Sequence, residues 1–210
     1  MEDIVDKAMK DGAVGLSTGL IYIPGTYTKT PEIVELAKVA AKYNGVYASH
    51  MRDEGDSVTQ AIEEALTIGR EAKIPVEISH FKLSGQHNWG RRKETVPMIE
   101  AAGIEVTIHQ YPYAASSTSI STLIPDEVLA AGQDSIKARL QRPDVKKYVI
   151  SYMLAKLKKR KLKHFSYAVV ANYTPDTTYN GKSIEQINLM KGRKHKVKEE
   201  AITIIDIMLN

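Results

Sequence analysis

Short apolar runs alternate with longer segments of helical periodicity between residues 12 and 113 of this 210-residue chain. Such alternation is typical of βαβ units, in which a helix connects two parallel strands. It predicts strands over 13–20, 45–50, 75–80 and 104–111, with helices over 31–43, 57–72 and 93–102. The chain therefore belongs to the α/β class.

The strands recur at intervals of about thirty residues, which is the repeat of a (β/α)8 barrel. A complete barrel usually needs roughly 250 residues. We therefore expect a partial TIM-type barrel of about four parallel strands. The rhythm alone also permits a doubly wound open sheet, but no G-x-G-x-x-G segment or P-loop follows any of the strands.

The pattern changes after Tyr113. A loop rich in Ser, Thr and Ala covers 114–122, and helical segments cover 126–164 with a break at Pro143. A short strand is expected over 167–172, followed by helices over 183–191 and 196–209. We divide the chain into a partial barrel, 1–122, and a mostly helical elaboration of the same barrel, 123–210.

The composition limits the classes of function. Hydrophobic residues make up 43% and charged residues 26% of the chain, and no apolar run approaches the length of a membrane span. We expect a cytoplasmic protein with no membrane partner. The net charge of +4 is mild, and the lysine-rich run 156–163 is interpreted as a solvated helix face, so no nucleic-acid partner is expected. The sequence has no cysteine, which excludes thiolate chemistry within it.

Two near copies carry the clearest signal for a site. VYASHMRDEG from Val46 and VEISHFKLSG from Val76 share the pattern V-x-x-S-H-x-[RK]-x-x-G, and each places a histidine at the end of a predicted strand. Neighbouring parallel strands lie about 4.8 Å apart. His50 and His80 are therefore predicted to present imidazoles to one metal ion at the carboxyl end of the sheet.

A cation follows each of these histidines by two residues. Arg52 and Lys82 are candidates to hold an anionic group such as a substrate carboxylate, although Arg52 could equally form a salt bridge with Asp53 or Glu54.

The other four histidines are weaker candidates. His109 is either a third ligand or a polar residue at the barrel mouth, His87 is expected in a loop, and His164 and His195 are expected to be exposed among lysines. No nucleophile elbow is present, which favours a metal-activated water as nucleophile.

Four ordered segments resemble the N-acyl-D-amino-acid deacylases, or D-aminoacylases, of the amidohydrolase superfamily. They are GAVGLSTGLIYIPGTY from Gly12, YASHMRDEGD from Tyr47, ISHFKLSGQHNWGR from Ile78 and YPYAASST from Tyr111, and the later YNGKSIEQI from Tyr179 is similar to the same family.

The resemblance implies a distorted (β/α)8 barrel that binds zinc and hydrolyses the amide bond between an acyl group and a D-amino acid, a C–N bond other than a peptide bond. It makes His50 and His80 the zinc-binding histidines of the fifth and sixth strands. Lys82 would lie near the scissile carbonyl and Tyr113 near the substrate carboxylate.

The resemblance covers the central portion of the family pattern. The H-x-H strand, the cysteine ligand and the aspartate general base of the family are not found here, so no catalytic base is assigned and we expect the chain alone to be inactive. An alternative is a cyclic amide hydrolase that resembles dihydroorotases or hydantoinases. Another is a non-catalytic binding or structural protein derived from a barrel. Self-association through the exposed sheet edges is a further expectation.

Overall fold

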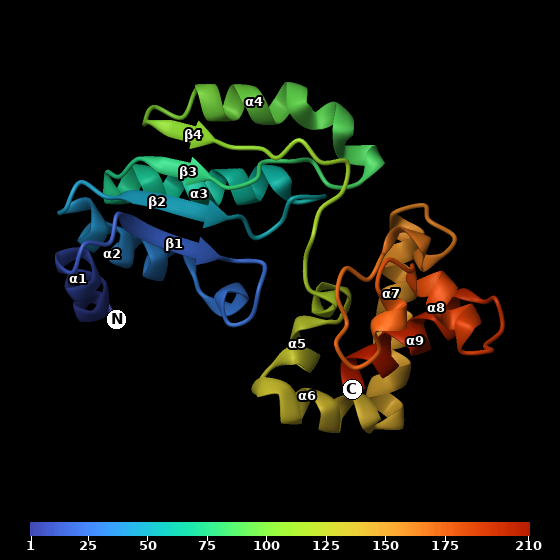
Figure 1. The fold of residues 1–210 in the computed structure, drawn as a ribbon. Helices are drawn as coiled ribbons and strands as arrows, with labels where there is room; N and C mark the ends of the chain where they lie inside the picture. The colour runs from blue at the N-terminus through green and yellow to red at the C-terminus, as the bar shows by residue number, and fades with distance from the viewer. The chain divides into compact units, whose positions relative to one another are not determined.

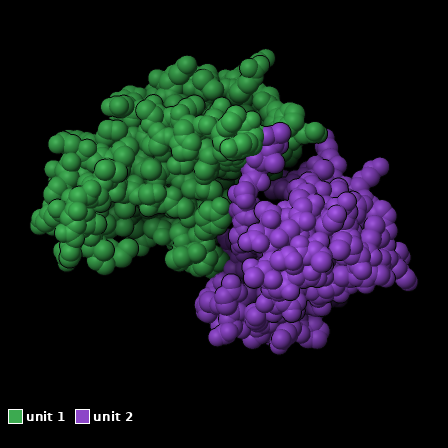
Figure 2. All heavy atoms as spheres, in the orientation of Figure 1, with its two compact units in different colours: residues 1–113 green, residues 114–210 purple.

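The computed structural model describes residues 1–210, which form two compact units, 1–113 and 114–210 (Figure 2). The units divide between Tyr113 and Ala114, so the difference from the domain division expected from the sequence concerns only the loop 114–122. Each unit has its own hydrophobic core.

Unit 1 is built on a parallel sheet with the strand order β1-β2-β3-β4, in which each strand pairs with the next strand along the chain (Figure 1). This order confirms the predicted partial barrel of four strands. A first helix, α1, was not predicted. In chain order the elements are α1 (Glu2–Lys10), β1 (Gly15–Gly19), η1 (Gly25–Tyr27), α2 (Thr30–Ala41), β2 (Val46–His50), α3 (Val58–Ala72), β3 (Val76–Ile78), η2 (Gln86–Arg91), α4 (Arg92–Glu100) and β4 (Val106–Ile108).

The two faces of this sheet differ in burial. Tyr47 pairs in register with Val76, and these side chains are buried in one core with the apolar residues of α3, which passes behind β2 and β3 in Figure 1. The next residue on each strand points to the other face, because side chains alternate along a strand. Ala48, Glu77 and Thr107 are paired at this level, and Thr107 is exposed. The second face therefore corresponds to the inner face of a barrel.

Unit 2 is helical. Its core contains residues from α6, α7, α8 and α9, and α9 packs against both α7 and α8. Pro143 begins α7, as its fixed φ favours at a first helical position, and so separates α7 from α6. The elements are η3 (Ile120–Leu123), α5 (Asp126–Leu129), α6 (Gly132–Gln141), α7 (Pro143–Lys159), η4 (Phe165–Tyr167), η5 (Thr177–Tyr179), α8 (Ile184–Met190) and α9 (Val197–Leu209).

The strand predicted over 167–172 is wrong. Tyr167 ends the short helix η4, and the following residues form only an isolated antiparallel bridge between Val169 and Ser183. No further segment extends this pairing into a sheet, because α8 begins at Ile184, immediately after the bridge. None of the helices combines the length and the apolar character that a membrane-spanning helix needs.

Candidate metal centre at the carboxyl end of the sheet

The strands of unit 1 bring His50 and His80 together. His50 is the last residue of β2, and His80 lies two residues beyond the end of β3, the next strand in the sheet. The Nδ1 atom of His50 and the Nε2 atom of His80 are 2.7 Å apart. Two imidazole nitrogens from neighbouring strands thus face one point at the carboxyl end of the sheet, as the repeated motif predicted.

The backbone at His80 turns to allow this approach. Its φ of +40° lies in the left-handed region, which costs a residue with a Cβ atom roughly 1–2 kcal/mol. The amide of His80 donates a hydrogen bond to Nε2 of His109, over 3.0 Å. A strained conformation held by a specific hydrogen bond is typical of functional sites.

His109 supports His80 from the neighbouring strand. Its Nδ1 atom lies 2.7 Å from a carboxylate oxygen of Glu77, and its Nε2 atom accepts the hydrogen bond from the His80 amide. Both ring nitrogens therefore have partners, Glu77 within β3 and the His80 amide in the segment that follows it. Of the two interpretations left open by the sequence, this geometry favours a polar residue at the barrel mouth that positions His80.

A carboxylate and an ammonium group occupy the other side of the His80 ring. Lys82 Nζ lies 2.8 Å from Nδ1 of His80 and donates to Oε1 of Glu54 over 2.6 Å. The same Glu54 oxygen is 2.9 Å from His80 Nδ1. Because these contacts are on Nδ1, the Nε2 atom is left to face His50. Sequence reasoning missed Glu54 as a member of this group, although it belongs to the first copy of the repeated motif.

The surroundings favour a neutral imidazole at His50. Its partial burial, followed by the proximity of the His80 ring, lowers the pKa of His50 below the ordinary value of about 6.5. A neutral imidazole is the form that coordinates a metal ion.

The donor set fits a zinc ion. His50 and His80 supply two imidazole nitrogens, which zinc commonly binds, and the nearby carboxylate of Glu54 lies on the Nδ1 side of His80. Two nitrogens bound to one tetrahedral zinc lie roughly 3.3 Å apart, as bond lengths near 2.0–2.1 Å require. The imidazoles of His50 and His80 would need to move apart by about half an ångström to reach this separation.

Arg52 is placed beside this group but faces another partner. Its guanidinium forms a forked ion pair with Glu64 of α3, with N···O distances of 3.0 and 2.9 Å, and donates to the carbonyl oxygens of Thr26 and Thr28. The expected salt bridge with Asp53 or Glu54 is wrong, because Glu64 occupies the guanidinium fork. Four of the five N–H groups of Arg52 are used in these bonds. Its predicted contact with substrate stays a prediction.

Tyr113 is the last residue of unit 1 and is 77% exposed. Its ring stacks on that of Tyr111, with centroids 6.1 Å apart, and Lys82 Nζ lies 5.5 Å from the centroid of Tyr111. Tyr111 thus stands between the two residues that were predicted to contact substrate. The substrate contacts of Lys82 and Tyr113 stay predictions.

The remaining histidines lie elsewhere. His87 is in η2, where its Nε2 atom is 2.7 Å from a carboxylate oxygen of Asp56. His195 is exposed as expected, but the expectation for His164 is wrong, because only 30% of its side chain is exposed. Both belong to a cluster in unit 2 that sequence reasoning missed.

Comparisons with known proteins converge on one group of enzymes. None of the family models matches the chain. A D-aminoacylase of Alcaligenes xylosoxydans xylosoxydans is 46% identical over 138 residues, which cover 65% of this chain and 28% of the relative. An N-acyl-D-aspartate deacylase of the same organism is 42% identical over 123 residues, 57% of this chain and 25% of the relative.

Solved structures agree with these relatives. A D-aminoacylase described as defining a novel subset of amidohydrolases superposes with a TM-score of 0.67 at 32% identity, over 96% of this chain and 34% of that one. An N-acyl-D-glutamate deacylase from Bordetella bronchiseptica, solved with zinc and a phosphonate inhibitor, gives a TM-score of 0.67 at 29% identity, over 97% and 35% of the two chains. The matches thus span about a quarter of the length of these curated relatives and about a third of the solved structures.

Proposed function

We propose that this chain is a central portion of an N-acyl-D-amino-acid deacylase of the amidohydrolase superfamily, and that the whole protein hydrolyses N-acyl-D-amino acids with zinc as its metal. The facing imidazole nitrogens of His50 and His80, 2.7 Å apart at neighbouring strand ends, are the observation that carries this proposal. Their place at the carboxyl end of a parallel sheet is where barrel enzymes hold their active sites.

His50 and His80 are the proposed zinc ligands of this chain. When bound, zinc polarises a carbonyl group and lowers the pKa of a coordinated water. Glu54 and Lys82 contact Nδ1 of His80 and so fix the orientation of the ring. A carboxylate on the far nitrogen of a coordinating histidine also raises its basicity as a ligand.

Lys82 and Tyr113 are the proposed substrate contacts. The ammonium group of Lys82 is held 2.6 Å from Glu54 and 2.8 Å from the backbone carbonyl of His80, which keeps it beside the imidazole pair. In this position it would bind the oxygen of the scissile carbonyl. Tyr113 would donate its hydroxyl to the substrate carboxylate. Arg52 has one N–H group left after its four hydrogen bonds and is proposed as a secondary contact for that carboxylate.

From the resemblance, we propose that further ligands and the general base lie outside these 210 residues. We therefore propose that the chain alone binds zinc without turning over substrate. The sheet offers a site for association, because β1 and β4 each have a neighbour on one side only. Association of these edges with another chain, including a second copy, is part of the proposal. The cytoplasmic location stays a prediction.

The test is hydrolysis of N-acetyl-D-methionine by the protein as the cell makes it, supplied with zinc. We expect hydrolysis of the D isomer and little of the L isomer. The His80→Asn variant should lose more than about a hundredfold in kcat/KM, since loss of a direct ligand should exceed the 10–100-fold typical of outer partners. His87→Asn is the matched control, because His87 lies in η2 and pairs with Asp56. This variant should keep its activity.

Other outcomes separate the alternatives. Hydrolysis of dihydroorotate or a hydantoin in preference to the acyl substrate would replace the proposal with a cyclic amide hydrolase. No hydrolysis of either class by the protein with zinc bound would contradict an enzymatic role and favour a binding module.

A further inference from the structure

A second cluster of histidine and carboxylate side chains lies in unit 2. Its members are His164, Glu185, His195 and Glu200. His164 precedes η4, Glu185 lies in the first turn of α8, His195 lies between α8 and α9, and Glu200 lies near the start of α9. Three segments of the chain therefore meet at one point: the segment after α7, the start of α8 and the start of α9.

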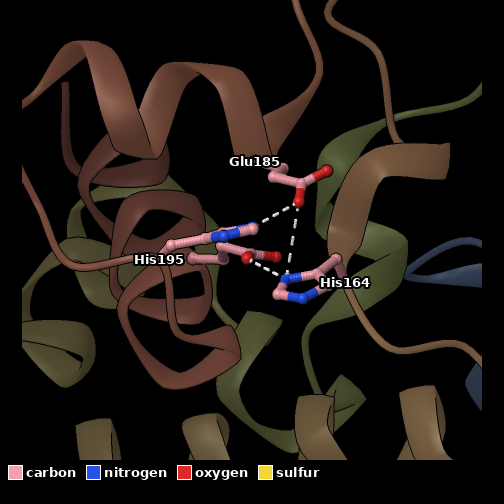
Figure 3. A group of neighbouring side chains, drawn as sticks. His164, Glu185 and His195 are labelled. Atoms are coloured by element: carbon pink, nitrogen blue, oxygen red, sulfur yellow. Dashed lines mark hydrogen bonds and ion pairs between the residues drawn. The ribbon is translucent and has the colours of Figure 1, made fainter.

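The polar atoms of this cluster face one another (Figure 3). Nδ1 of His164 is 2.5 Å from Oε1 of Glu200 and 3.7 Å from Oε1 of Glu185. The same Glu185 oxygen is 2.5 Å from Nε2 of His195. The two imidazole rings stack with centroids 4.4 Å apart, and one ligand atom from each of the four residues falls within 4.8 Å of the others.

Burial makes the charge of this cluster costly. The side chain of Glu200 is 0% exposed, and its second oxygen accepts a hydrogen bond of 2.8 Å from the amide of Phe165. With both imidazoles neutral, the two carboxylates give the group a charge of about −2. A buried carboxylate requires a compensating positive charge, and a divalent cation would neutralise the pair.

We propose that these four side chains form a structural zinc site, separate from the barrel site. Two imidazole nitrogens and two carboxylate oxygens make up a four-coordinate protein ligand set, as in closed structural zinc sites. Tetrahedral zinc needs ligand separations of roughly 3.3 Å, so the two contacts of 2.5 Å must lengthen by under about 1 Å. His195 can move to meet this requirement, because its side chain is 52% exposed and lies outside the helices.

The site would join the start of α8, the start of α9 and the segment after α7. These segments share the core of unit 2, in which Phe165, Ile184, Ile187 and Ala201 are buried. Zinc bound at this point would stabilise the packing of unit 2, and its role would be structural.

The experiment uses the full 210-residue chain with His50→Asn and His80→Asn already in place, so that the barrel site cannot contribute. Zinc per chain is measured by elemental analysis after dialysis, and the melting temperature is measured with and without zinc. We expect about one zinc ion per chain, lost when His164→Asn and His195→Asn are added, and a melting temperature several degrees higher with zinc. His87→Asn is the control and should retain the zinc.

The single variant His195→Asn separates loss of zinc binding from loss of folding, because an exposed side chain can be replaced without disturbing the core. It should keep the far-ultraviolet circular dichroism of the parent chain and weaken zinc binding at least tenfold. Cobalt(II) provides a second readout, since a tetrahedral site gives strong visible absorption. Zinc binding that is absent, or unchanged in the His164 and His195 variants, would overturn the proposal and leave a hydrogen-bonded ion-pair cluster.

Discussion

Arg52 illustrates how a residue in the repeated motif acquires a structural role. Its guanidinium connects α3, through Glu64, to the carbonyl oxygens of Thr26 in η1 and of Thr28, which follows η1. The pairing with Glu64 is forked, and the partly buried guanidinium has a raised pKa because of that hydrogen bond. The planar fork of arginine suits this geometry, and a lysine ammonium does not.

The Arg52→Lys variant should therefore lower the free energy of unfolding of unit 1 by about 2 kcal/mol, since hydrogen bonds to charged groups contribute roughly 1.5–3 kcal/mol each. The measurement is the urea dependence of hydrogen exchange in peptides from α3, which reports the unfolding of unit 1. Arg70→Lys is the matched control, because Arg70 pairs with Glu63 on the exposed surface of the same helix and should change the stability by under about 0.5 kcal/mol. Equal losses of unfolding free energy in the two variants would contradict the structural role of Arg52.

At the residue scale the sequence predicted the positions of His50 and His80 better than it predicted which side chains pair with the residues of the site. His50 and His80 stand in a repeated motif at strand ends, and such a pattern is visible without coordinates. Glu64 lies twelve residues beyond Arg52 on the next helix, so its pairing depends on how α3 packs. The cluster around His164 has no recurring spacing, which is why a sequence pattern could not reveal it.

Close packing between a helix and the sheet determines the position of α3. Gly69 lies on the buried side of this helix, against Val76 of β3 and Ile104. A Cβ atom at Gly69 would meet Val76 Cγ2, would lie 2.5 Å from Ile104 Cδ1 and would lie 3.2 Å from the carbonyl oxygen of Ile74. Glycine at this position lets the helix approach the strand.

We expect Gly69→Ala to destabilise unit 1 by about 1–3 kcal/mol, the usual cost of overpacking a core. Helix propensity acts in the opposite direction, by about 1 kcal/mol in favour of alanine. The measurement is the free energy of unfolding in urea. Gly90→Ala is the control, since no atom lies within 4 Å of a Cβ built there. A stabilised Gly69→Ala variant would contradict the tight packing of α3 against β3.

Elements with a regular periodicity were predicted well, and elements that depend on a partner were not. The apolar stripe of α3 and the strands of unit 1 follow from local sequence patterns. The segment 167–172 has strand-like apolar residues, but its pairing is limited to the bridge between Val169 and Ser183. A strand needs a neighbour of sufficient length, and the sequence of one segment does not report on that neighbour.

At the scale of the whole chain, two separate hydrophobic cores underlie two compact units. Leu66 in α3 belongs to the first core and is 1% exposed, and Leu140 in α6 belongs to the second and is 0% exposed. The parallel strands and the change of composition after Tyr113 allowed the two kinds of structure to be predicted. That the two units have separate hydrophobic cores became evident only from the side-chain packing in the structure.

Leu66→Ala should lower protection from hydrogen exchange in peptides of residues 1–113, and Leu140→Ala in peptides of residues 114–210. Each truncation should cost about 2–5 kcal/mol in its own unit, as typical for buried leucines. Mass spectrometry of exchanged peptides measures both units in one sample, and each variant serves as the control for the other. Loss of protection throughout the chain in either variant would contradict independent cores.

The central claim is that His50 and His80 hold a zinc ion, and the most direct test is the zinc content of the 210-residue chain with and without these histidines. To remove the contribution of unit 2, the comparison is made with His164→Asn and His195→Asn present in both samples. We predict that zinc bound to the chain with His50 and His80 intact is lost when both are replaced by asparagine, and is retained in the His87→Asn control. Equal zinc contents with and without His50 and His80, or no zinc in either sample at concentrations that saturate deacylase metal sites, would contradict the account.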